Sequence, residues 1–137
     1  MEAKKSEIQG VIFSGKGEGQ YFLSLPGYQK RIQGVVGFRP FAGTLNLKVD
    51  PIESTDFLGD FEPIDIAGFS ESGRNFGSLK LYQIQLNGER VYIVVPEKSS
   101  YHGDVLEIIA EANLRQKFQL RDGDQLLLIN SLETLWK

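Results

Sequence analysis

Residues 15–19, Gly-Lys-Gly-Glu-Gly, have the composition of a loop that binds phosphate groups. Glycines at alternate positions let backbone N–H groups approach an anion closely, and Lys16 adds a positive charge. The segment is not a dinucleotide fingerprint, because Gln20 stands where the third glycine is required and residues 21–25 are expected to be extended. It is also not a P-loop, which needs Gly-Lys-Ser/Thr at the start of a helix. From these residues alone, a flexible hairpin turn explains the glycines equally well.

Residues 43–49, Gly-Thr-Leu-Asn-Leu-Lys-Val, alternate between polar and apolar side chains and predict a strand that ends at Asp50-Pro51. The alternation places Thr44, Asn46 and Lys48 on one face and the apolar side chains in the core. Thr44 and Asn46 then offer two neutral oxygens on one rigid element, which suits a Mg²⁺ ion that arrives with a nucleotide. An ordinary half-exposed polar face is the more common meaning of such a pattern.

Two further polar residues are candidates for chemistry. Glu107 lies within the apolar run of residues 105–110, so its carboxylate either points to solvent or is held in a pocket. In a pocket it can accept a hydroxyl proton or bind a polyol. Arg115 follows in a short predicted helix, where it either meets a phosphate or lies on the surface.

The elements that must position these residues are mostly strands. Asn87-Gly88 is a strong signal for a tight hairpin turn, and the continuous apolar run of residues 91–95 predicts a strand that is covered on both faces. Residues 51–69 show no clear pattern. Strands are predicted over residues 7–13, 43–49, 76–86, 89–95, 105–110 and 125–129.

Two short helices complete the prediction. Apolar residues at helical spacing predict one helix over residues 27–37, with Gly37 as its C-terminal stop. The other covers residues 114–118 and has Asn113 as its N-cap. Many short strands with two short helices indicate a mainly β protein with a closed barrel, and we expect a single domain over residues 1–137.

Composition excludes several classes of function. The 137 residues include no cysteine and one histidine, which excludes disulfides, zinc ribbons, thiol nucleophiles and multi-histidine metal cages. The net charge of −3 argues against a protein that coats nucleic acid. No apolar run approaches the roughly 18 residues of a membrane span, and residues 1–6 are unlike a signal peptide. We therefore expect a cytoplasmic protein with no nucleic-acid or membrane partner.

Taken in order, the motifs resemble the archaeal CTP-dependent riboflavin kinase family, and the resemblance runs over nearly the whole chain. The segments that carry it are Ser14-Gly-Lys-Gly-Glu-Gly19, Tyr21-Phe-Leu-Ser-Leu-Pro26, Gly37-Phe38, Gly43-Thr-Leu-Asn-Leu-Lys48, Val94-Val-Pro96, Tyr101-His102, Glu107-Ile-Ile-Ala110, Leu114-Arg115 and Asp122-Gly-Asp124.

The resemblance implies a six-stranded cradle-loop barrel that transfers the γ-phosphoryl group of CTP to riboflavin, giving FMN and CDP. It implies one Mg²⁺ ion, bound with CTP by Thr44 and Asn46, and flavin contacts from Ser100 and Glu107, of which Glu107 is the candidate catalytic residue. For this chain we expect a monomer, with no N-terminal winged-helix extension before the barrel. The implied nucleotide-binding residues are Gly15, Lys16, Gly17, Glu18, Gly19, Gln20, Ala112, Asn113, Leu114 and Arg115.

Two alternatives from other classes stay open at this point. Residues 114–118 followed by Asp122-Gly-Asp124 also resemble the swapped-hairpin segment of AbrB-like DNA-binding barrels, for which Lys30, Arg31 and Arg39 would form a basic patch. The other alternative is a flavin-binding module without catalytic activity. The presence of Thr44, Asn46 and Glu107 speaks against such a module.

Overall fold

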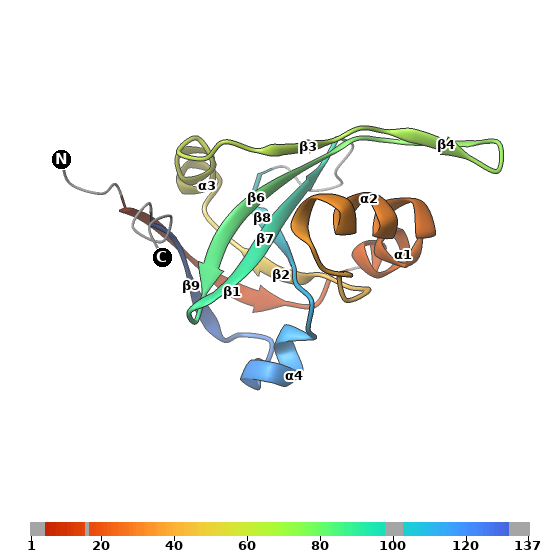
Figure 1. The fold of residues 1–137 in the computed structure, drawn as a ribbon. Coiled ribbons are helices and arrows are strands. Elements are labelled where there is room, and N and C mark those ends of the chain that lie inside the picture. Colours follow the sequence, from red (N-terminus) through yellow and green to blue (C-terminus); the bar gives the residue numbers. More distant parts are fainter. Residues whose placement is uncertain (1–4, 16, 98–102, 132–137) are drawn as a thin grey trace.

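A computed structural model describes residues 5–15, 17–97 and 103–131 (Figure 1). Six antiparallel strands follow one another around a barrel in the order β6-β7-β8-β2-β1-β9, and pairing of Gln85 on β6 with Ile129 on β9 closes it. This confirms the predicted mainly β, closed six-stranded barrel. The barrel strands are β1 (Lys5–Phe13), β2 (Leu45–Lys48), β6 (Leu79–Leu86), β7 (Glu89–Pro96), β8 (Val105–Ile109) and β9 (Gln125–Ser131).

The apolar core has two parts because some barrel strands are covered on both faces. Val91 and Ile93 of β7 belong to the cluster inside the barrel, whereas Tyr92 and Val94 belong to a second cluster beneath the helices. All four side chains are buried, which confirms the prediction that residues 91–95 form a strand covered on both faces. Burial of both faces anchors the helical layer firmly to the barrel wall.

The hairpin turn lies where the sequence predicted it, between β6 and β7. Asn87 and Gly88 have φ angles of 49° and 80°, the left-handed conformations that a type I′ turn requires. The first hairpin strand begins at Leu79 instead of residue 76, because Phe76 ends a separate short strand.

Two of the four helices in the described part of the chain match the prediction. Helix α2 (Pro26–Val36) ends at Gly37, which has a φ angle of 86°. Helix α4 (Leu114–Phe118) begins after Asn113, whose side chain accepts a hydrogen bond from the backbone N–H of Gln116.

Helix α1 (Glu18–Ser24) corrects two predictions: residues 21–25 are not extended, and the predicted loop of residues 15–19 ends at Gly17, because Glu18 and Gly19 already belong to the helix. Pro26 does not mark the end of a strand here. It is the first residue of α2, a position that tolerates proline because its missing N–H would have no helical partner. Leu23 of α1 is fully buried in the cluster beneath the helices, so tertiary packing stabilises this short helix.

Helix α3 (Pro51–Leu58) lies in the segment that had no clear sequence pattern. The Asp50 side chain caps it by accepting from the backbone N–H groups of Ile52 and Glu53, and Pro51 is its first residue. Asp50-Pro51 therefore follows the end of strand β2 and also starts helix α3. The sequence pattern had predicted only the end of the strand.

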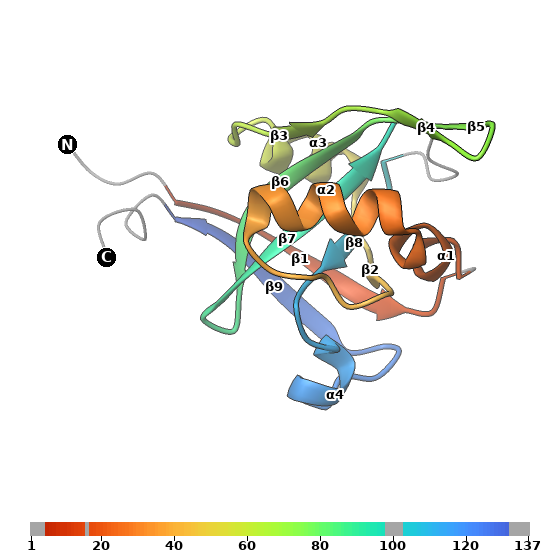
Figure 2. The ribbon, with the colours of Figure 1, turned by 45° about the vertical axis from the view of Figure 1, so that its right-hand side comes forward.

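Three short strands extend the fold beyond the barrel. Strand β3 (Ile64–Ile66) pairs with β6, whereas β4 (Phe69–Glu71) and β5 (Arg74–Phe76) pair only with each other. Together β4 and β5 form a hairpin that projects past the barrel and lies over α1 and α2 (Figures 1 and 2).

Candidate active site

Most of the residues predicted to do chemistry meet in one pocket of about 190 Å³. It lies where the loop after β1, the start of α1, strands β2 and β8, and helix α4 come together. The lining residues are Phe13, Ser14, Gly15, Gly17, Gly19, Gln20, Thr44, Asn46, Glu107 and Arg115. The pocket thus brings the glycines of the loop at residues 15–19 close to the candidate metal ligands Thr44 and Asn46, to the Glu107 carboxylate and to Arg115.

Thr44 and Asn46 share a face, as the alternation predicted. The Thr44 hydroxyl donates a hydrogen bond to Asn46 Oδ1 over 2.8 Å. Asn46 is only 7% exposed, so this face is a pocket wall and not the half-exposed polar surface that an ordinary strand presents. Lys48, the third polar residue of the same face, is exposed and pairs with Asp104.

Glu107 is held in the pocket and does not point to solvent. It is 8% exposed and lies directly opposite Asn46 in the antiparallel pairing of β2 with β8. Side chains of directly opposite residues emerge on the same side of a sheet, close to one another. The pairing therefore brings a carboxylate beside the two neutral oxygens of Thr44 and Asn46.

The glycine loop reaches this wall through helix α1. A Cβ atom added at Gly19 would lie 2.5 Å from Thr44 Oγ1, so only glycine allows α1 to start this close to β2. Gly17 precedes the helix with a φ angle of 83°. Lys16 lies outside the described residues, as does the side chain of Glu18.

Arg115 is fixed by partners on two other elements. Its guanidinium donates to the backbone carbonyl of Phe13 at 3.2 Å and forms an ion pair with Asp122 at 2.7 Å. The Ser14 hydroxyl also donates to Asp122, at 2.8 Å. The hydrogen bond from Arg115, followed by that from Ser14, lowers the pKa of Asp122.

Asp122 is a site residue that the sequence analysis missed. Asp122-Gly-Asp124 served only as a segment of the family resemblance and of the AbrB-like alternative, yet Asp122 links Arg115 to Ser14 at the start of the glycine loop. The signal for this role lies in three separate segments of the chain, which come together only in the folded barrel.

The other residues predicted to contact the nucleotide, Ala112 to Leu114, have mixed positions. Ala112 lines a neighbouring pocket of about 390 Å³ together with Phe38 and Glu111. The Asn113 side chain caps α4, and Leu114 is buried in the barrel core. Of the two predicted flavin contacts, Ser100 lies outside the described residues and Glu107 lies in the pocket.

The donor set in the pocket fits a hard cation that arrives with phosphate groups. Within the described residues, no cluster of three or more histidine, cysteine, aspartate or glutamate side chains is placed to hold a metal by itself. Thr44, Asn46 and Glu107 each supply a side-chain oxygen, the ligand type that Mg²⁺ prefers when it keeps waters and substrate phosphates.

A larger groove of about 600 Å³ runs between α3 and β1. None of the predicted site residues lines it, and carboxylates such as Glu53 and Asp56 contribute to its rim. The larger volume of this groove therefore does not make it the candidate active site. The smaller pocket contains the glycines, side-chain oxygens and arginine that suit phosphate and metal binding.

Fold and pocket define a β-barrel protein with a candidate site for a phosphorylated ligand and a metal ion. Residues 12–129 match the family model CTP-dep_RFKase, described as "Domain of unknown function DUF120". The chain belongs to this family of CTP-dependent riboflavin kinases.

Curated relatives carry the name riboflavin kinase. The chain is 42% identical to the protein of Archaeoglobus fulgidus over 121 residues, which make up 86% of this chain and 52% of that protein. It is 35% identical to the protein of Ignicoccus hospitalis over 125 residues, or 90% of this chain and 70% of the relative. For Pyrobaculum aerophilum the identity is 40% over 117 residues, or 84% and 56%. The matched part of the chain thus spans between 52% and 70% of the length of these relatives. Among the described residues, no helix is long and apolar enough to cross a membrane.

Proposed function

We propose that this chain is a CTP-dependent riboflavin kinase that transfers the γ-phosphoryl group of CTP to the terminal hydroxyl of the riboflavin ribityl chain. The products are FMN and CDP. The family and the names of its relatives support this proposal. The observation that carries it in this chain is the cluster of Thr44, Asn46 and Glu107 against the glycine loop.

Phosphoryl transfer depends on positioning and charge stabilisation more than on covalent chemistry by the protein. In this proposal, the backbone N–H groups of residues 15–20 hold the CTP phosphates, and Arg115 compensates part of their negative charge. Thr44 and Asn46 would hold Mg²⁺ through their side-chain oxygens. When bound, the ion neutralises charge on the transferred group.

Glu107 is proposed to act on the acceptor side of the pocket. Its carboxylate would accept a hydrogen bond from the ribityl hydroxyl and orient it towards the phosphate. It is also the group available to receive the hydroxyl proton, although a loose transition state needs little proton abstraction early in the reaction. By resemblance to the family, Ser100 would contact the flavin, and residues Ala112 to Arg115 would line the cytidine site.

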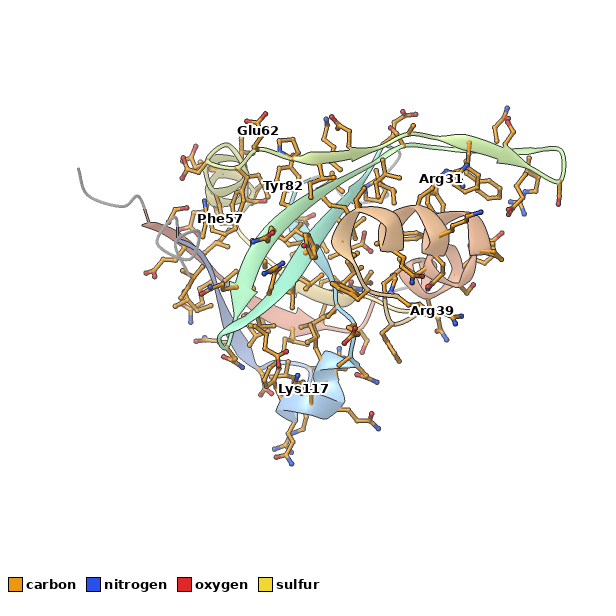
Figure 3. All side chains as sticks on the ribbon, in the orientation of Figure 1. Arg31, Arg39, Phe57, Glu62, Tyr82 and Lys117 are labelled. Atoms are coloured by element: carbon orange, nitrogen blue, oxygen red, sulfur yellow. The ribbon has the colours of Figure 1, made fainter. Side chains whose placement is uncertain are left out.

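The DNA-regulator alternative has less support in the structure. Arg31, one of three residues of the expected basic patch, already stacks on the Phe69 ring and donates to the Gly27 carbonyl. Figure 3 shows Arg31 beneath the β4–β5 hairpin, whereas Arg39 lies below α2. We propose that the barrel acts as one catalytic domain and a monomer in the cytoplasm, without a nucleic-acid partner.

Transfer of a labelled phosphoryl group tests this function. The purified chain is incubated with riboflavin, Mg²⁺ and CTP that carries the label on its γ-phosphate. The label is expected in FMN, and chelation of the metal should abolish its transfer. Release of labelled inorganic phosphate without labelled FMN would contradict a riboflavin kinase.

A further inference from the structure

We propose that the β4–β5 hairpin is a brace that holds helix α1 and thereby positions the glycine loop for the nucleotide. Its key positioning residues are Arg74 on β5 and Tyr21 on α1. The inference rests on the proposed function, because it assigns the brace a role in nucleotide binding. Figure 2 shows the hairpin reaching over the end of the helical layer where α1 lies.

The hairpin needs an external support. Strands β4 and β5 have three residues each and pair only with one another. A two-stranded hairpin alone is only marginally stable in water. Its residues from Ser70 to Asn75 are exposed, so the support comes from the aromatic residues at its base and from contacts with the helices.

Aromatic packing attaches the base of the hairpin to the helical layer. Tyr28 of α2 makes edge-on contacts with Phe69, Phe76 and Phe22, with ring centroids 4.9, 6.0 and 5.6 Å apart. A Cβ atom added at Gly27 would lie 2.3 Å from the Phe69 ring. Glycine at this position therefore lets the hairpin approach α2 closely enough for these contacts.

Polar contacts continue this attachment towards the glycine loop. The Arg74 guanidinium lies 5.3 Å from the Phe76 ring centroid and donates to the Tyr21 hydroxyl at 3.1 Å. The Tyr21 backbone N–H in turn donates to the carbonyl of Gly17, at 3.2 Å, in the first turn of α1. Arg74 is thus linked through one residue to the loop that lines the pocket.

Helix α1 is consequently held from two directions. On one side Gly19 contacts Thr44, a candidate metal ligand, and on the other side Tyr21 is held by Arg74. Any displacement of α1 moves the glycine loop relative to Thr44. Arg74 is exposed and Tyr21 is 51% exposed, so their contact adds little to the core and acts mainly on the position of α1.

Arg74→Ala and Tyr21→Phe test the brace, and Glu71→Ala is the matched control. Glu71 is exposed and lies directly opposite Arg74 on β4. Both brace variants should raise KM for CTP about three- to tenfold, the effect of losing one ordinary exposed hydrogen bond. The value of kcat and the melting temperature should stay nearly unchanged. Arg74→Lys, which keeps a charged donor, should recover part of the loss.

The double variant Arg74→Ala/Tyr21→Phe should be no worse than either single variant, because both remove the same interaction. Amide hydrogen exchange in α1 should be faster in both brace variants than in Glu71→Ala. This exchange measurement needs no catalysis, so it tests the brace even if the wild-type chain makes no FMN. Unchanged α1 exchange in Arg74→Ala, or a KM change equal to that of Glu71→Ala, would overturn the proposal.

Discussion

Asn46 on β2 and Glu107 on β8 lie directly opposite each other in the barrel wall, and their residues are 7% and 8% exposed. A buried amide and a buried carboxylate at neighbouring positions are costly unless both are hydrogen-bonded. Asn46 accepts a hydrogen bond from Thr44, and both Asn46 and Glu107 line the candidate pocket. The pairing places the candidate metal side and the candidate acceptor side of the reaction next to each other.

Glu107→Gln tests the role of the carboxylate. A hydrogen bond to a charged group contributes about 1.5–3 kcal/mol, and glutamine keeps the shape but not the charge. We expect KM for riboflavin to rise about tenfold while kcat changes about threefold or less. Steady-state kinetics at saturating CTP measure both constants, with exposed Glu62→Gln as the control.

A change in kcat without a change in KM for riboflavin would give Glu107 a different catalytic role. If kcat falls by about 10²–10⁴ and KM is unchanged, the carboxylate is a general base instead of an acceptor-binding group. If both kcat and KM of Glu107→Gln equal the wild-type values, Glu107 has no role in the reaction.

Thr44→Val removes the hydroxyl of the candidate metal ligand while keeping the shape of the side chain. The Mg²⁺ concentration for half-maximal activity should rise about tenfold, because one of two protein oxygens is lost. Thr44→Ser keeps the hydroxyl and should behave nearly as the wild type. The activity of each variant is measured as a function of Mg²⁺ concentration at fixed CTP. If Thr44→Val and wild type show the same Mg²⁺ dependence, Thr44 is not a metal ligand.

Gly19→Ala tests the close contact between α1 and β2. The new methyl group meets Thr44 Oγ1 at 2.5 Å, so either the helix or the Thr44 side chain must move. We expect activity to fall at least about tenfold, because positioning errors of about 1 Å cost up to 10²-fold.

Gly34→Ala is the matched helical control, since a Cβ atom at Gly34 meets nothing within 4 Å. This control should keep full activity and gain up to about 1 kcal/mol of stability from helix propensity. Equal activity of Gly19→Ala and Gly34→Ala would show that the close contact between Gly19 and Thr44 does not affect the reaction.

Local chemistry explains why much of the fold could be predicted from the sequence. Asn87-Gly88 determines its turn by itself, and Asn113 caps α4 within one helical turn. Helix α1 could not be predicted this way, because it depends on burial of Leu23 and on the fit of Gly19 against Thr44. Both contacts arise only when the helix packs on the barrel.

The candidate site shows the same division. Alternation along residues 43–49 predicted that Thr44 and Asn46 share one face, and the hydrogen bond between them agrees with this prediction. The position of Glu107 opposite Asn46 depends on the register of β2 with β8, which no local pattern determines. The role of Asp122 depends likewise on Arg115 and Ser14, which approach it only in the closed barrel.

Asp122→Asn should change the dependence of stability on pH. Hydrogen bonds from Arg115 and Ser14 hold the pKa of Asp122 below its ordinary value of 3.8. A lowered pKa stabilises the folded state above pH 3.8, and the contribution is lost as the pH falls through the folded-state pKa. Wild type should therefore melt at a higher temperature than Asp122→Asn at pH 7, and the difference should shrink as the pH falls below 3.8.

Melting curves across this pH range make the comparison, with Asp56→Asn as an exposed control. A difference between wild type and Asp122→Asn that stays constant as the pH falls well below 3.8 would show that ionisation of Asp122 is not its source.

The choice of phosphoryl donor tests the proposed CTP-dependent riboflavin kinase most directly. The chain is incubated with riboflavin and Mg²⁺ in the presence of CTP, ATP, GTP or UTP at equal concentration, and FMN is separated and quantified by chromatography. We expect rapid FMN formation with CTP and far slower formation with ATP. Equal rates with CTP and ATP, or FMN formation with ATP alone, would contradict a CTP-dependent riboflavin kinase.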